Sequence, residues 1–205
     1  MARTSDPAVR AALIEAAARL LADDGLAALS IRRVAAEVGT STMAVYTHFG
    51  SKDDLIAGVV REAFARLATE LADEGTVSDD PVRDLMAAGA AYRRMALANP
   101  HLYRVMFGLN PMALGDPAAA ALGDPSSPDA PVDRDAAQRT FEVLVDVMDR
   151  AVQADLVRGE PRLLAIQAWA TMHGLVSLEL AGFLGDRSDE AYAAITRTLA
   201  VGLGN

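Results

Sequence analysis

The stretch from Gly39 to Ile56, GTSTMAVYTHFGSKDDLI, constrains the fold of this chain most. It combines the signals of a short helix, a glycine stop and the capped start of a longer helix. Directly upstream, LSIRRVAAEVG (residues 29–39) has the spacing of an amphipathic helix, and Gly39 suits the position just beyond its end. Two short helices joined by a tight turn of this kind predict a helix-turn-helix, whose second helix can enter the major groove of DNA.

The rest of the sequence also predicts helices. Apolar residues make up 52% of the 205 residues and aromatic residues only 5%, a composition that favours closely packed helices. No run of alternating apolar and polar residues bounded by Asn-Gly or Asp-Gly supports a strand. We therefore predict an all-α protein of about nine helices. Their starts are signalled by Asp6, Ser30, Ser41, Ser51, Asp80, Asn99, Asp135, Pro161 and Ser188. We expect the seventh helix to run from Asp135 to Val157 and the eighth from Pro161 to Leu184.

These helices predict two domains. Residues 1–52 would form a three-helix DNA-binding domain, and residues 53–205 a C-terminal helical bundle. A long helix from Ser51 to about Glu74 would connect them. Five prolines between residues 108 and 133 predict a surface loop, with at most one helical turn at residues 118–122.

The amino-acid composition indicates the cellular environment in which the protein is expected. The absence of cysteine excludes disulfides and is compatible with a reducing cytoplasm, where we expect the protein to reside. We identify no apolar stretch long enough to cross a bilayer, and MARTSDPAVR lacks the apolar segment of a signal peptide. No membrane partner is therefore expected.

The net charge of −9 is unevenly distributed. Residues 1–60 carry six basic and seven acidic side chains, whereas residues 61–205 carry thirteen and twenty-one. Arg3, Arg10, Arg32, Arg33 and Lys52 are available for one N-terminal face. Because DNA binding needs only a local basic footprint, the acidity of the whole chain does not exclude it.

The second helix of the predicted motif has two different faces. Val45 and Phe49 lie four residues apart and would pack inward. Hydroxyl and thioether groups on the opposite face suit base edges, and tyrosine and histidine suit phosphate oxygens. That face carries Thr42, Met43, Thr47, Tyr46 and His48. The same residues could also be ordinary surface side chains.

Lys52 favours the DNA interpretation. It is the only lysine of the chain and lies in the first turn of a predicted helix, where the helix dipole disfavours a cation. Asp53 and Asp54 could offset that cost. A lysine beside the free N–H groups of a helix start also makes a phosphate site, and Arg32 admits the same interpretation in the preceding helix.

From about Pro7 to Ile56 the sequence resembles the TetR family of bacterial transcription regulators. The matching residues, at the family's spacing, are Ala35, Gly39, Ser41, Tyr46, His48, Phe49, Ser51, Lys52, Leu55 and Ile56. The resemblance implies a homodimer whose recognition helices enter successive major grooves of a palindromic double-stranded operator. It implies phosphate contacts by Ser30, Tyr46, His48 and Lys52, and base contacts by Arg32, Thr42, Met43 and Ala44, in a DNA-binding set completed by Ser41 and Thr47.

The segment AWATMHGLVSLEL resembles the C-terminal domain subtype named for Trp169, His173 and Gly174. Its helix is apolar on two sides, which indicates burial against its own core or a ligand on one side and a twin subunit on the other. The expected effector pocket comprises Tyr92, Met95, Tyr103, Met106, Phe107, Phe141, Trp169, Met172 and His173, although the same residues could be plain core. The expected dimer interface comprises Leu175, Leu178, Gly182, Ala191, Ile195 and Leu199.

The function expected from this resemblance is a transcriptional repressor released from its operator by a small hydrophobic effector. A transcriptional activator of the same fold, or a dimeric ligand-binding protein with a vestigial DNA-binding domain, are the alternatives. We expect no enzyme, because no nucleophile elbow, P-loop or Rossmann glycine pattern occurs. We expect no cofactor. We also expect no metal site, because the three histidines are widely spaced.

Overall fold

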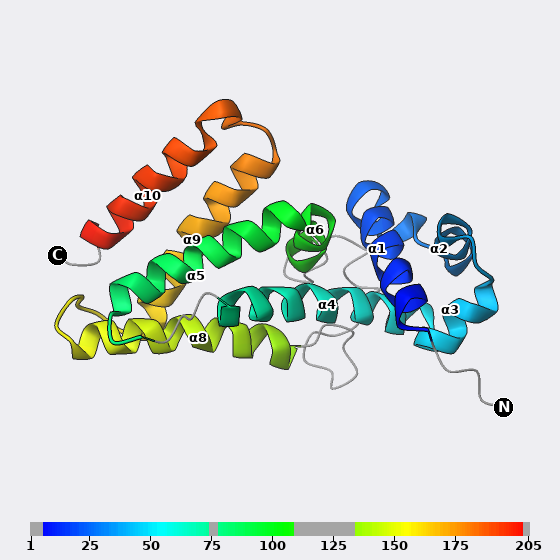
Figure 1. The fold of residues 1–205 in the computed structure, drawn as a ribbon, viewed down its shortest axis with the longest axis horizontal. Coiled ribbons are helices and arrows are strands. Elements are labelled where there is room, and N and C mark those ends of the chain that lie inside the picture. The colour runs from blue at the N-terminus through cyan, green and yellow to red at the C-terminus, as the bar shows by residue number, and fades with distance from the viewer. Residues whose placement is uncertain (1–5, 74–77, 109–133, 203–205) are drawn as a thin grey trace. The chain divides into compact units, whose positions relative to one another are not determined.

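The computed structural model describes residues 6–73, 78–108 and 134–202 (Figure 1). Within these ranges the regular structure is entirely helical, as predicted, and no strand occurs. The α-helices are α1 (Pro7–Asp24), α2 (Ile31–Val38), α3 (Thr42–Phe49), α4 (Lys52–Asp73), α5 (Pro81–Ala98), α6 (Pro100–Gly108), α8 (Arg134–Gln153), α9 (Pro161–Leu180) and α10 (Ser188–Gly202). Two short 3₁₀ helices, η1 (Leu26–Ala28) and η2 (Gly185–Arg187), were not predicted. The loop and the turn predicted between residues 109 and 133 lie outside the described residues.

The predicted N-terminal caps determine where the first helices begin. The Asp6 carboxylate accepts a hydrogen bond from the Ala8 N–H at 2.9 Å, which satisfies a donor that the helix itself leaves unpaired. Ser30 and Ser41 cap α2 and α3 in the same way. Ser51 Oγ accepts from the Asp54 N–H at 3.0 Å at the start of α4. These four starts are confirmed.

Two predicted helix ends are wrong. We expected the helix beginning near Asp135 to reach Val157, but α8 ends at Gln153 and Asp155 adopts a left-handed φ of 54°. We expected the helix beginning at Pro161 to reach Leu184, but α9 ends at Leu180 because Gly182, with φ 78°, turns the chain. Apolar residues continue past both ends, so apolar spacing alone extends the helices too far.

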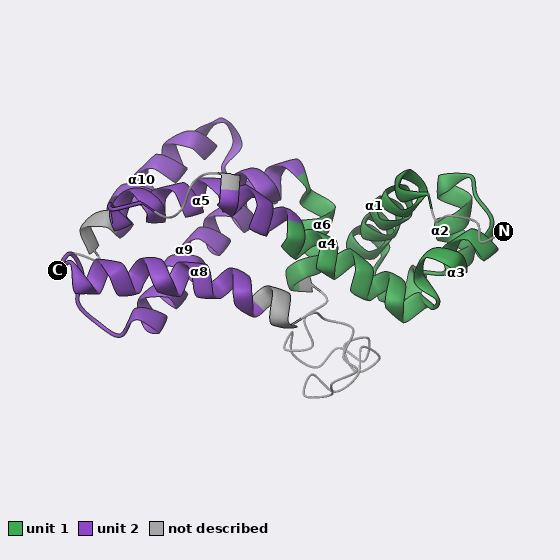
Figure 2. Cartoon of the chain, turned by 60° about the horizontal axis from the view of Figure 1, so that its bottom comes forward, with its two compact units in different colours: residues 1–65, 99–136 green, residues 66–98, 137–205 purple. Residues whose placement is uncertain are grey.

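The chain divides into two compact units (Figure 2). Unit 1 comprises residues 1–65 and 99–136, and unit 2 comprises residues 66–98 and 137–205. Helix α4 contributes to both, and α6 belongs to unit 1 although it follows α5 of unit 2. The functional division into residues 1–52 and 53–205 stays a prediction.

Unit 1 is built around α1. Leu13 and Ile14 of α1 are fully buried, as are Val34 of α2 and Val45 of α3, so the three helices share one core. Helix α6 packs against α1. A Cβ atom at Gly58 of α4 would lie 3.0 Å from the Phe49 ring, so glycine allows this close approach.

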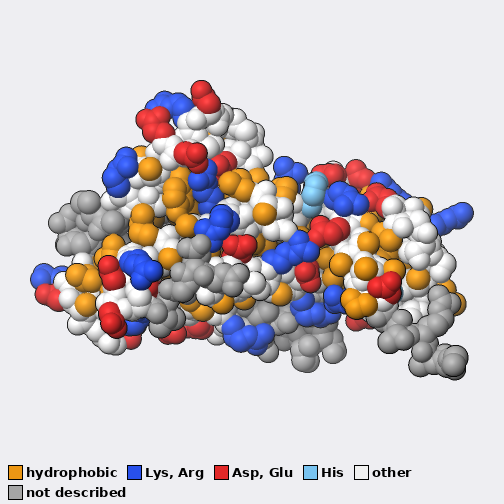
Figure 3. Space-filling view, viewed as in Figure 1, with side chains coloured by type: hydrophobic (Ala, Val, Ile, Leu, Met, Phe, Trp, Pro, Cys, Tyr) orange, Lys and Arg blue, Asp and Glu red, His pale blue; other side chains and the backbone are white. Residues whose placement is uncertain are grey.

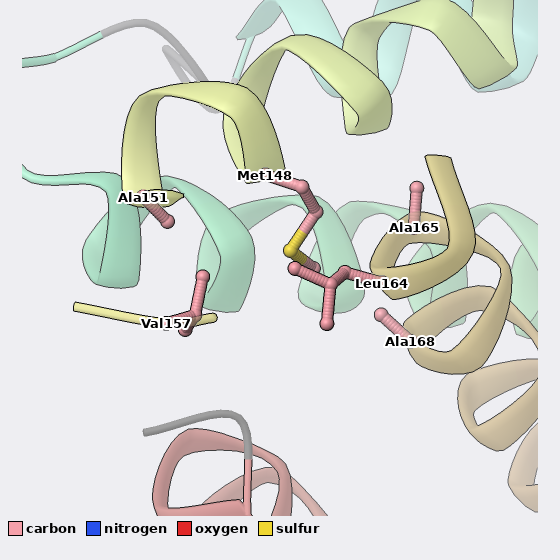
Figure 4. Packing of buried hydrophobic residues seen from close by; sticks show 6 residues of the cluster. All are labelled: Met148, Ala151, Val157, Leu164, Ala165 and Ala168. Carbon is pink, nitrogen blue, oxygen red and sulfur yellow. The ribbon is translucent and has the colours of Figure 1, made fainter. Parts of the chain in front are cut away.

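Unit 2 has a core between α8 and α9, in which Met148 points toward Leu164 (Figure 4). Asp84 of α5 is fully buried and forms an ion pair with Arg150 of α8 at 2.7 Å. Arg93 of α5 makes a bidentate contact with Glu179 of α9, at 2.8 and 2.6 Å. These two ion pairs, of which only the Asp84 carboxylate is fully buried, link α5 to its neighbours in unit 2.

Helix α9 is long and apolar enough to cross a membrane by length and composition, a feature that the sequence analysis overlooked. The core helix of a soluble protein passes the same test, so the finding is weak evidence for a span. Leu164, Ala168 and Leu175 of α9 are buried inside unit 2.

Candidate DNA-binding site and effector domain

The turn between α2 and α3 fixes the orientation of α3. Gly39 adopts a left-handed conformation with φ 70°, and its N–H donates to the carbonyl of Ala36 at 3.2 Å. The Ser41 hydroxyl then accepts from the Ala44 N–H at 3.1 Å and starts α3. Val45 and Phe49 are buried. The opposite side of α3 is therefore left on the surface of unit 1.

Helix α3 and its N-cap carry several of the residues that the sequence predicted for contacts with bases and phosphates. Met43 is 70% exposed and Tyr46 50% exposed. Ser41, Thr42 and Thr47 are exposed, while Ala44 and His48 are half-buried. The Thr47 hydroxyl donates to the Met43 carbonyl at 2.8 Å. The structure thus brings these predicted residues together on one short helix.

The neighbouring arginines Arg32 and Arg33 differ in their surroundings. Arg33 forms an ion pair with Asp24 at 2.7 Å and also donates to the Ala28 carbonyl at 3.3 Å. Arg32 is exposed and has no side-chain hydrogen bond or ion pair within the described part of the chain. Arg33 therefore links α2 to α1 and η1, whereas Arg32 is available to a ligand.

The other predicted cations are less available than expected. Arg10 lies over the Phe49 ring at 5.3 Å, and the Lys52 ammonium donates to the Leu26 carbonyl of η1 at 3.4 Å. Arg3 lies outside the described residues. On the face shown in Figure 3, acidic and basic side chains are interspersed. A basic footprint of unit 1 would thus be small and local. Ser30, the remaining predicted phosphate contact, is exposed and caps α2.

Six of the nine predicted effector-pocket residues lie in unit 2. The Tyr92 hydroxyl lies 3.0 Å from His173 Nδ1, and burial lowers the pKa of His173, which favours the neutral form of the ring. The Trp169 ring, 39% exposed, lies 5.9 Å from the ring of Phe141. Met95 and Met172 are buried. These residues combine apolar surface with one polar pair.

The other three predicted pocket residues lie in unit 1. Tyr103 and Met106 are buried in α6, and the Tyr103 ring meets that of Phe107 edge-on at 5.0 Å. Helix α6 packs on α1, which explains this burial within the N-terminal unit. No local sequence signal predicts that pairing, because α1 and α6 are distant in the chain.

The predicted dimer residues also differ in placement. Leu178 is 47% exposed and Gly182 is exposed, but Leu175 is only 3% exposed and packs inside unit 2. Ala191, Ile195 and Leu199 of α10 are half-buried. On α9, Leu178 shares its exposed side with three residues that the sequence analysis missed: Leu163 (59% exposed), Ile166 (43%) and Ala170. Helices α9 and α10 form an antiparallel hairpin (Figure 1).

Metal-ligating side chains are not clustered in the described ranges. No group of three or more His, Cys, Asp or Glu residues there could hold a metal ion.

Together these features define a helix-turn-helix protein of the DNA-binding, transcription-regulating class. A family model described as "Bacterial regulatory proteins, tetR family" matches residues 13–59. A second, described as "Tetracyclin repressor-like, C-terminal domain", matches residues 85–201, more than half of the chain. The protein belongs to the TetR family of transcription regulators.

Curated relatives and solved structures agree with this assignment. An HTH-type transcriptional regulator of Mycobacterium tuberculosis is 32% identical over 102 residues, which are 49% of this chain and 44% of the relative. The HTH-type transcriptional repressor AcnR of Corynebacterium diphtheriae is 35% identical over 78 residues, 38% of this chain and 40% of the relative. The chain thus spans less than half the length of these relatives. The TetR family regulator PfmR of Thermus thermophilus shares the fold, with a TM-score of 0.73 at 22% identity, covering 94% of this chain and 99% of that one.

Proposed function

We propose that the protein is a homodimeric, cytoplasmic repressor that binds a palindromic operator and is released from it by a small hydrophobic effector. The observation that carries the proposal is the exposed side of α3, held outward by the buried Val45 and Phe49. The relative AcnR, named a transcriptional repressor, supports repression as the direction of control. In this proposal residues 1–52 bind DNA, and residues 53–205 bind the effector and the second subunit.

On the DNA, α3 would lie in the major groove. Arg32 of α2 and three residues of α3, Thr42, Met43 and Ala44, would face base edges, with Ser41 and Thr47 beside them. Ser30, Tyr46, His48 and Lys52 would meet phosphates. Lys52 keeps two of its three N–H donors for this contact, because only one is used on the Leu26 carbonyl.

The adjacent arginines provide a matched test of DNA binding. We expect Arg32→Ala to lower operator affinity by about 10- to 100-fold and to relax preference at particular base pairs, because one exposed base contact is lost. Arg33→Ala should leave affinity within about threefold, because its guanidinium already binds Asp24 and contributes mainly about 0–1 kcal/mol of stability. Fluorescence anisotropy measures the affinity of both variants for the DNA upstream of the protein's own coding sequence, over a series of salt concentrations. Base-substituted copies of that DNA measure the preference at single base pairs. If Arg32→Ala leaves affinity and preference unchanged at low salt, this assignment is wrong.

The direction of regulation has its own measurement. Deleting the coding sequence should raise the transcript that starts at the bound upstream DNA, since the proposal is repression. A fall in that transcript would instead identify an activator of the same fold.

We further propose that unit 2 belongs to the subtype named for Trp169, His173 and Gly174, and that it holds the effector. The side chains that support this are the half-exposed Trp169 beside Phe141, and the Tyr92–His173 pair. A mostly apolar ligand could cover the rings and meet one polar group, which is the usual balance of a small-molecule site. Helix α4, which runs from the helix-turn-helix into unit 2, would carry the response.

Trp169 is the only tryptophan, so its fluorescence reports on this site directly. We expect 8-anilinonaphthalene-1-sulfonate, an anionic dye with apolar aromatic rings, to quench Trp169 emission by energy transfer. Saturating operator should weaken dye binding by about 5- to 150-fold, because coupling between two sites is reciprocal. Phe141→Ala should weaken dye binding while leaving dye-free operator affinity within about twofold. Dye binding that is equal with and without operator would contradict the coupling.

A further inference from the structure

The exposed side of α3 lacks the side chains that usually recognise guanine. Its sequence, TMAVYTHF, contains no arginine, lysine, asparagine or glutamine. Arginine and lysine are the side chains that donate to guanine O6 and N7, and asparagine and glutamine pair with adenine. If α3 lies in the major groove, most of its base contacts must therefore be of another chemical kind.

The centre of this surface is apolar. Met43, in the first turn, is 70% exposed and carries a flexible, polarisable thioether. Thr47 lies four residues on, on the same side of the helix. Its hydroxyl hydrogen is used on the Met43 carbonyl at 2.8 Å, so it is not available to a base. Thr47 can therefore offer DNA its methyl group more readily than a hydrogen-bond donor.

We propose that α3 recognises the C5-methyl groups of thymine, with Met43 as the principal contact and Thr47 as the second. This inference rests on the proposed operator binding and names the base chemistry that the operator must present. Thymine is the only unmodified base that displays a methyl group in the major groove. A half-site should accordingly contain one or two thymines whose methyl groups, rather than their hydrogen-bonding atoms, determine affinity.

Deoxyuridine substitution tests the inference, because it removes the methyl group and leaves base pairing and groove hydrogen bonds unchanged. The operator is first selected from random-sequence DNA with the full-length protein, and its thymines are then replaced one at a time. We expect one or two positions in each half-site to lose about fourfold in affinity per methyl group, the effect of burying one apolar carbon. In Met43→Ala, the effect should fall below about twofold at one position of each half-site, whereas a second position, contacted by Thr47, should keep its effect.

Two controls distinguish the possible failures. Arg32→Ala should bind more weakly but keep the full deoxyuridine effect, since Arg32 lies on α2. Met43 is exposed, so Met43→Ala should keep the melting temperature of the parent protein. An operator that is bound normally with deoxyuridine at every thymine would overturn methyl recognition while leaving the proposed function intact. A methyl effect that persists in Met43→Ala at every sensitive position would overturn the role of Met43. Recovery of no preferred DNA sequence at low salt would instead overturn operator binding itself.

Discussion

Replacing Leu178 with arginine is expected to convert the protein into monomers and to lower operator affinity by about 1,000-fold. Leu178 is 47% exposed in unit 2 and shares the exposed side of α9 with Leu163 and Ile166. A guanidinium on that surface would have to be buried, without a counter-charge, if a second subunit covered it. The two recognition helices of a dimer must lie about 34–36 Å apart to meet successive major grooves, so a monomer keeps only half of the contacts.

The matched control is Leu97→Arg, which introduces the same charge on α5, where Leu97 is 41% exposed. We expect this variant to stay dimeric and to bind the operator normally. Light scattering measures the oligomeric state and fluorescence anisotropy the affinity. Because Leu178 is already accessible, its arginine variant should keep its helical circular dichroism. Dimers that persist in the double variant Ile166→Arg/Leu178→Arg would show that the interface lies elsewhere.

The helix-turn-helix was predictable in detail because its signals are local. Ser30, Ser41 and Ser51 each accept a hydrogen bond from the N–H three residues on, so a cap can be recognised from a few letters of sequence. Gly39 marks the turn for the same reason, since its left-handed backbone conformation is a property of one residue. Family resemblance then added the roles of the exposed side chains, which spacing alone could not assign.

The partners of long-range contacts were not predictable in the same way. Helix α9 is apolar on two sides, and nothing in the periodicity distinguishes Leu175, which is buried in its own unit, from Leu178, which is exposed. Lys52 appeared available from its position at a helix start, yet its ammonium bonds the Leu26 carbonyl of a 3₁₀ helix that was not predicted. The same limit explains the division of the predicted pocket residues between the two units.

Replacing Asp84 with alanine is expected to lower the free energy of unfolding by about 3 kcal/mol. The Asp84 carboxylate is fully buried and accepts hydrogen bonds from the Ser78 N–H at 2.9 Å and the Ser78 hydroxyl at 2.7 Å. It also pairs with Arg150, whose guanidinium donates to the Ser78 carbonyl at 2.6 Å. The substitution removes an acceptor for Ser78 and the counter-charge of Arg150 together. No signal in the sequence distinguished Asp84 from the many exposed acidic residues.

Chemical denaturation of Asp84→Ala and Glu190→Ala compares the loss of unfolding free energy at a buried and at an exposed ion pair. The comparison distinguishes the effect of burial from the effect of removing a charge. Glu190 pairs with Arg187, but both side chains are about two-thirds exposed or more, so its removal should cost less than about 1 kcal/mol. Asp84 and Glu190 both belong to unit 2. Equal losses in the two variants would show that the buried carboxylate contributes no more than a surface ion pair.

The pH dependence of the Asp84 contribution follows from its surroundings. Burial alone would raise the pKa of Asp84, but the hydrogen bonds from Ser78 and the charge of Arg150 outweigh it, and the net pKa lies below the ordinary value of 3.8. A carboxyl group with a lowered pKa stabilises the folded protein fully above its unfolded-state pKa and loses that contribution as the pH falls through the folded-state value. The difference in unfolding free energy between the parent protein and Asp84→Ala should therefore be constant from about pH 5 to 7 and shrink below about pH 4. If this difference in unfolding free energy is undiminished at about pH 2, the ionised carboxylate is not its source. The difference would then arise from the shape or packing of the Asp84 side chain.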